Sequence, residues 1–118
     1  DAGHIAFAGG DNLRVMELIG KLIAHVNTKD IRRAVVDGLD RSKESFLDAV
    51  VKGAFTVPGD GSLDFEAIVK ALASKGYEGW FVVEAEQDPK VSPPLEMAKK
   101  GHKELLRVMA AAGYEVVQ

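Results

Sequence analysis

The chain has 118 residues, of which 47% are hydrophobic and 28% charged, a length and balance that suit one globular domain with its own core. A formal net charge of -3, with acidic and basic residues mixed along the chain, excludes the basic stripe that nucleic-acid binding requires. The chain also has no cysteine and no apolar run near the roughly 20 residues that cross a bilayer. We therefore expect a cytoplasmic domain over residues 1–118 without nucleic-acid or membrane partners, in which any metal is held by His, Asp or Glu.

The first half of the chain predicts a helix, a strand and a charged loop, in that order. Asp11 is placed to cap a short helix that ends at Gly20. The apolar run from Leu22 to Val26, interrupted by His25, predicts a buried strand with its exit loop at 27–30. The stretch 31–43 is charged and weakly periodic, which favours a loop before a short helix at about 45–51.

The second half alternates strands and helices more clearly. The run 54–57 predicts a strand that ends at the turn formers 58–61. Asp64 then caps a helix with an apolar stripe at the i, i+3, i+4, i+7 spacing, and Gly76 marks its end. The run 80–85 predicts a strand, and Pro93 and Pro94 open a long helix that reaches Gly113.

Three apolar strands separated by helices predict an α/β fold with parallel strands and right-handed crossover helices. An open sheet of three such strands leaves two edges unpaired, whereas a (β/α)₈ TIM barrel leaves none and needs about 250 residues. The chain also begins on Asp1, without a methionine or a polar lead-in. We therefore expect the C-terminal half of a TIM barrel, cut from a longer protein.

Polar residues near the expected strand ends are the candidate site, because such barrels bind ligands at the C-terminal ends of their strands. His25 and Glu84 each interrupt an apolar strand, and Asp1 and His4 stand where another strand end is expected. Carboxylates with an imidazole suit a divalent ion, and Mn²⁺ or Co²⁺ is favoured. Each residue also has a structural alternative: a strand histidine is often hydrogen-bonded in the core, and a terminal aspartate is usually solvated.

Four segments, taken together, resemble the last four strand ends of the xylose isomerase-like barrel family. They are Asp1–His4, His25–Asp30, Phe55–Gly61 and Val82–Pro89. Within that family, Phe7–Asp11, Val57–Gly61 and Glu84–Pro89 are most similar to the inosose dehydratase group.

The resemblance implies a metal held by Asp1, His25 and Glu84, with a fourth ligand from a glutamate on an earlier strand. Glu86 is the rival of Glu84, because residues two apart point to the same side of a strand. The resemblance further implies dehydration of a keto-inositol, with His4 and Lys29 in proton transfer and oxyanion contact and Asp30 orienting Lys29 or binding a substrate hydroxyl.

Two alternatives to this function remain open. A sugar isomerase or epimerase has the same fold and metal. A half-barrel without catalytic activity is the other alternative. Its exposed strand edges would pair with the missing N-terminal half or with a second copy of the chain.

Overall fold

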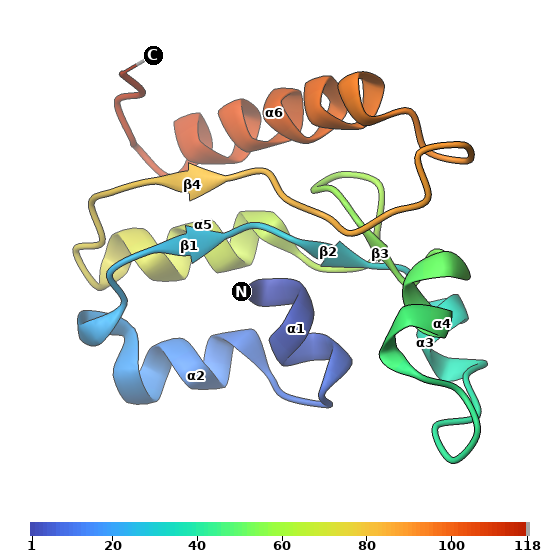
Figure 1. The fold of residues 1–118 in the computed structure, drawn as a ribbon. Helices are drawn as coiled ribbons and strands as arrows, with labels where there is room; N and C mark the ends of the chain where they lie inside the picture. The colour runs from blue at the N-terminus through green and yellow to red at the C-terminus, as the bar shows by residue number, and fades with distance from the viewer. Residues whose placement is uncertain (118) are drawn as a thin grey trace.

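The structure, a computed structural model, describes residues 1–117 as short strands flanked by helices (Figure 1). The elements in chain order are α1 (Ala2–Phe7), α2 (Asn12–Ile19), the 3₁₀ turn η1 (Gly20–Leu22), β1 (Val26–Asn27), β2 (Asp30–Ile31), α3 (Arg33–Asp37), α4 (Phe46–Val51), β3 (Phe55–Thr56), α5 (Phe65–Ser74), β4 (Phe81–Val82) and α6 (Pro94–Ala111). None of the helices in this part of the chain combines the length and apolar character that a membrane crossing needs.

Four helices begin where the sequence predicts them to begin. The side chains of Asp11 and Asp64 accept hydrogen bonds from backbone amides in the first turns of α2 and α5. Ser45 and Asp48 form a reciprocal capping box at the start of α4, and Pro94 occupies the first turn of α6. These four predicted helix starts are confirmed. They could be predicted because a helix cap depends on residues within one turn of each other.

The strands β1 and β4 form the expected parallel pair. Val26 lies opposite Phe81 and Asn27 opposite Val82, so two segments more than fifty residues apart run side by side. Thr28 prolongs the pairing, since both its backbone nitrogen and its hydroxyl donate to the carbonyl of Val82 at 2.8 Å. The C-terminal ends of β1 and β4 therefore lie at the same edge.

The expectation of three parallel strands is wrong for the remaining strand. β3 pairs with β2 instead, and this pair is antiparallel, with Asp30 opposite Thr56 and Ile31 opposite Phe55. The stretch 31–43, expected to be a loop, contributes the second residue of β2 and all of α3. The strand and helix were not predicted because this stretch is mostly charged, and only Ile31 and Val36 are buried in it.

The strand expected at Leu22–Val26 is also misplaced. Leu22 belongs to η1 and is 80% exposed, and the strand begins at Val26, one residue after His25. A short apolar run does not distinguish a strand from the end of a helix by periodicity alone. As a result His25 lies at the N-terminal end of β1, not at the C-terminal end where the site was expected.

Two apolar clusters hold the elements together. In the larger one, α5 packs between α2 and α6, and the buried side chains of Ile68, Val69 and Leu72 meet Met16 and Leu105 (Figure 1). The smaller cluster joins α1, β2, β3, α3 and α4 around Ile31 and Phe55. Between them, α1 lies against β2, and its first turn reaches the C-terminal ends of β1 and β4.

Candidate functional site

A buried lysine lies at the centre of the polar residues that follow β1 and β4. The side chain of Lys29 is only 1% exposed, and its Nζ is 2.7 Å from Glu86 Oε2 and 3.2 Å from both Asp1 Oδ2 and Glu84 Oε1. The fourth neighbour is His4, whose Nε2 lies 3.0 Å from Nζ. We call these five residues the Lys29 cluster. A buried ammonium group is expensive unless it is paired, and three carboxylates provide the pairing here.

Each member reaches the cluster from a strand end or a helix start. Lys29 follows β1, and Glu84 and Glu86 follow β4, so the parallel pairing brings them to one edge. Asp1 caps α1, and its Oδ1 accepts a hydrogen bond from the backbone nitrogen of His4 at 2.8 Å. The same carboxylate thus starts the helix with one oxygen and contacts Lys29 with the other.

Gly3 makes room for the aliphatic part of Lys29. A Cβ atom at position 3 would lie 2.6 Å from Lys29 Cγ and 2.9 Å from Lys29 Cβ, closer than packed carbon atoms come. On the other side, Lys29 Nζ lies 5.4 Å from the centre of the Phe55 ring, within cation–π range. The lysine is therefore held along its whole length.

His4 is half-exposed and fixed in orientation by aromatic rings. Its imidazole meets Phe46 and Phe55 edge-on, with ring centres 5.7 and 5.4 Å apart. Because an ammonium group can only donate, Nε2 of His4 is the acceptor in the contact with Lys29. A neutral His4 then carries its proton on Nδ1, which lies 3.6 Å from Asp1 Oδ2. Nε2 is thus the nitrogen of His4 that can take up a proton once its contact with Lys29 is exchanged for one with a substrate.

The pKa of Glu86 is shifted by its surroundings in the cluster. Burial acts to raise the pKa of Glu86, but Lys29 outweighs burial, and this pKa lies below its ordinary value. The contact with Lys29 is an ion pair without well-aligned hydrogen-bond geometry, which leaves the buried Oε2 of Glu86 without a hydrogen-bond partner in the described chain. Both Glu84 and Glu86 face the lysine, so both remain candidate ligands.

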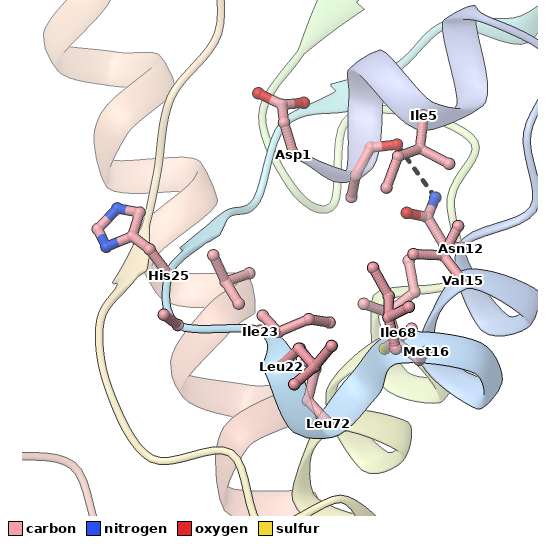
Figure 2. A pocket seen from close by; sticks show the side chains of 14 residues that line it. Asp1, Ile5, Asn12, Val15, Met16, Leu22, Ile23, His25, Ile68 and Leu72 are labelled. Atoms are coloured by element: carbon pink, nitrogen blue, oxygen red, sulfur yellow. Dashed lines mark hydrogen bonds between the residues drawn. The ribbon is translucent and has the colours of Figure 1, made fainter.

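The structure does not bring His25 to the cluster. His25 is exposed and lines the rim of a cavity of about 260 Å³ between α1, α2 and β1. Figure 2 shows its ring directed away from the carboxylate of Asp1, which lines the same cavity. Across residues 1–117, no three His, Asp or Glu side chains are arranged to hold a metal ion. His25 was a candidate ligand because it was expected at the C-terminal end of a strand, but it precedes β1.

Asp30 is also separate from the cluster and is part of the framework. It is 1% exposed, and its Oδ1 accepts from the backbone nitrogens of Ile31, Ser62 and Leu63 at 2.7, 3.0 and 2.9 Å. Burial raises the pKa of Asp30, against the effect of these hydrogen bonds. The expected contact with Lys29 is not made. Asp30 instead ties β2 to the loop before α5.

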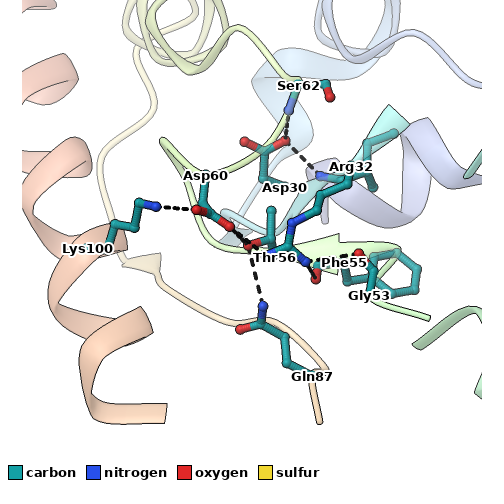
Figure 3. A network of polar contacts seen from close by, with 10 residues as sticks. Asp30, Arg32, Gly53, Phe55, Thr56, Asp60, Ser62, Gln87 and Lys100 are labelled. Atoms are coloured by element: carbon teal, nitrogen blue, oxygen red, sulfur yellow. Dashed lines mark hydrogen bonds and ion pairs between the residues drawn. The ribbon is translucent and has the colours of Figure 1, made fainter. Parts of the chain in front are cut away.

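A second polar network, which the sequence did not reveal, lies beside Asp30 (Figure 3). Asp60 accepts from Thr56 and Arg32 at 2.6 Å each and pairs with Lys100 of α6. Gln87, after β4, reaches Thr56 at 3.4 Å. Burial alone would raise the pKa of Asp60, but Lys100, Thr56 and Arg32 lower it to about 2. From the sequence, Asp60 is only a turn former, because its charged partners, Arg32 and Lys100, are 28 and 40 residues away.

This lowered pKa makes the stability contribution of Asp60 dependent on pH. A carboxyl group with a depressed folded-state pKa stabilises the fold above its unfolded pKa, near 4, and loses that effect as the pH falls toward 2. Urea unfolding of Asp60→Asn should therefore differ most from the parent protein at pH 6 and least near pH 2. Asp64→Asn is the control, since asparagine caps a helix as well as aspartate does. A difference for Asp60→Asn that stays constant down to pH 2 would count against the network.

Comparison with known proteins places this chain in a family. Residues 1–112 match the xylose isomerase-like TIM barrel family. The chain belongs to this family. It is 50% identical over 116 residues to the rhizopine catabolism protein MocC of Rhizobium meliloti, covering 98% of this chain and 36% of that protein.

Other relatives of this TIM-barrel chain carry the name inosose dehydratase. The protein from Clostridium perfringens is 50% identical over 103 residues, covering 87% of this chain and 35% of its own length. The protein from Geobacillus thermodenitrificans is 51% identical over 100 residues, covering 85% and 34%. The chain thus spans about a third of the length of the curated relatives it matches.

The Lys29 cluster lies where TIM-barrel enzymes bind their ligands, at the C-terminal ends of parallel strands. Its donors fit a divalent ion in kind, since it offers carboxylate oxygens from Asp1, Glu84 and Glu86 and an imidazole nitrogen from His4. Glu86 Oε2 is already in contact with a cation, because it lies 2.7 Å from Lys29 Nζ. In the structure, the ammonium group of Lys29 stands among these donors.

Proposed function

We propose that this chain is the C-terminal part of a hydro-lyase of the inosose dehydratase type. The reaction removes water from 2-keto-myo-inositol and gives a trihydroxycyclohexanedione, a step of inositol breakdown in the cytoplasm. The observation that carries the proposal is the Lys29 cluster, where His4, Lys29 and three carboxylates meet at the C-terminal ends of β1 and β4. About 50% identity to proteins named inosose dehydratase supports the choice of substrate.

His4 and Lys29 have different roles in the proposed reaction. His4, as a neutral imidazole, takes the proton from the carbon next to the ketone, and electron density moves toward the ketone oxygen. The ammonium group of Lys29 donates a hydrogen bond to that oxygen as negative charge develops there. A proton from an acid then accompanies the departing hydroxide, which leaves as water. The enol that remains rearranges to the diketone.

We also propose that Mn²⁺ or Co²⁺ binds at this cluster. Asp1 and Glu84 would hold it together with a glutamate from the upstream part of the protein, and Glu86 is the alternative to Glu84 at the same edge. His25, the third ligand expected from the sequence, lies at the opposite end of β1 and is left out of this proposal. When bound, such an ion supplies a Lewis acid for the ketone and an adjacent hydroxyl.

The experiment is a turnover assay on the purified full-length protein. We expect dehydration of 2-keto-myo-inositol, followed by the absorbance of the diketone, and no conversion of ketohexoses. Ketohexose isomerisation or epimerisation without dehydration would favour the alternative enzyme of the same fold. The chain 1–118 alone is expected to be inactive, because it lacks the upstream ligand and the rest of the barrel wall. Turnover by that chain, shown by mass to be free of longer protein, would contradict the proposal.

Finally, we propose that the chain pairs with the upstream half of its barrel, or with a second copy when that half is absent. Large apolar side chains are exposed, among them Leu22 at 80% and Trp80 at 77%. The two short strand pairs also leave strand edges open to a partner. Light scattering of the chain 1–118 checks this: a well-folded monomer would contradict it.

A further inference from the structure

The central position of Lys29 has a consequence for metal binding that goes beyond the dehydratase chemistry. We propose that Lys29 is an internal counter-ion, which holds the three carboxylates of the cluster together and competes with a divalent cation for them. The inference rests on the proposed function only in placing the divalent ion at this cluster. It concerns affinity for the ion and does not depend on the identity of the substrate.

The first step is the balance of charge. Asp1, Glu84 and Glu86 place three carboxylates within 3.2 Å of one Nζ atom. Over residues 1–117, these carboxylates form ion pairs with Lys29 alone, and Asp1 and Glu86 also lie 3.6 and 3.5 Å from the ring nitrogens of His4. Among the side chains of the described residues, Lys29 is therefore the group that lies between these carboxylates and offsets their mutual repulsion.

The second step is confinement of the lysine. Its stem passes Gly3 so closely that a Cβ there would lie 2.6 Å from Lys29 Cγ, and the whole side chain is 1% exposed. The ammonium group therefore does not swing freely into solvent when another cation approaches. A divalent ion that binds Asp1, Glu84 or Glu86 has to displace the ammonium group or share the carboxylates with it.

Either outcome weakens binding of the ion. A cation beside a carboxylate shifts the proton equilibrium of that carboxylate by one to three powers of ten, and here Nζ and the ion compete for the same oxygens. A neutral side chain at position 29 should therefore raise the affinity for Mn²⁺ by about tenfold or more. The same change leaves the carboxylates without a counter-ion, so it should lower the melting temperature when no metal is present.

The experiment compares the full-length protein with Lys29→Met, which keeps the aliphatic length and removes the charge. Free Mn²⁺ is measured by electron paramagnetic resonance during titration, and melting is followed with and without Mn²⁺. We expect Lys29→Met to bind Mn²⁺ at least tenfold more tightly and to gain more melting temperature from it than the parent protein does. Lys100→Met is the matched control. Lys100 also pairs with a mostly buried carboxylate, that of Asp60, but in the other polar network. It should leave Mn²⁺ affinity unchanged.

Unchanged or weaker Mn²⁺ binding by a folded Lys29→Met protein would overturn the inference, as would an equal gain for Lys100→Met. If Lys29→Met fails to fold without metal, Lys29→Gln keeps a polar group in the same space and is titrated in its place. The result is separate from the dehydratase assay. Tighter Mn²⁺ binding by Lys29→Met, with no turnover of keto-inositol by the parent protein, would leave this inference standing and remove the proposed substrate. Turnover by the parent protein, with unchanged Mn²⁺ binding by Lys29→Met, would do the opposite.

Discussion

Replacing His4 with glutamine in the full-length protein is expected to lower kcat for keto-inositol dehydration about 10²- to 10⁴-fold, the usual contribution of a general acid or base. His4 is the most exposed side chain of the cluster, and its Nε2 faces the buried Lys29 at 3.0 Å. Glutamine keeps hydrogen-bonding groups near the Phe46 and Phe55 rings but cannot take up a proton at neutral pH. Steady-state kinetics with the keto-inositol measure the change.

Two other histidines are the controls for this result. His102→Gln changes an exposed side chain of α6 and should leave kcat within about twofold. His25→Gln tests the placement of that residue: the structure predicts a small effect, whereas a metal ligand would cost much of the Mn²⁺ affinity. A kcat for His4→Gln close to that of the parent protein would remove His4 from the proposed chemistry.

Replacing Asp30 with alanine is expected to cost about 2–4 kcal/mol of unfolding free energy, because each buried donor left without an acceptor costs about 1–3 kcal/mol. One carboxylate oxygen of Asp30 accepts from three backbone nitrogens, at Ile31, Ser62 and Leu63, and alanine leaves all three without an acceptor. Asp30→Asn keeps an oxygen in that place and removes a charge whose burial is unfavourable, so it should remain within about 1 kcal/mol of the parent protein. Urea unfolding at neutral pH measures both.

The asparagine variant also separates two roles for Asp30. If the side chain is part of the framework, Asp30→Asn keeps both stability and turnover. If its negative charge serves the reaction, as the family resemblance implies, Asp30→Asn stays folded and loses activity. An alanine variant as stable as the parent protein would mean that the three amides find other partners, and the structural role would then be wrong.

Helix starts were predictable because their signals are local. Asp11, Ser45, Asp64 and Pro94 each act within one turn of the helix that they begin, and the sequence shows that turn directly. The family was also predictable, since four strand-end segments in order are more specific than any one residue, and the match over residues 1–112 confirms it.

The pairing of strands and the centre of the cluster were not predictable in this way. Ile31 forms a strand only because Phe55, 24 positions later, lies opposite it. No residue near Ile31 in the sequence indicates this pairing. Lys29 lies in a polar stretch typical of an exposed loop, yet it is almost fully buried. Asp1, Glu84 and Glu86 come together around it from distant parts of the sequence. Contacts between residues so far apart in the sequence cannot be predicted from the pattern of neighbouring residues.

The close approach of Gly3 to Lys29 predicts how these two positions vary together among related proteins. A methyl group at position 3 would overlap the stem of the lysine, so a relative that carries alanine or a larger residue there should carry a shorter residue at the position of Lys29. Such a protein would need another source of positive charge for its carboxylates. The pair of positions is thus a marker by which members with a lysine-centred cluster can be told apart from members without one.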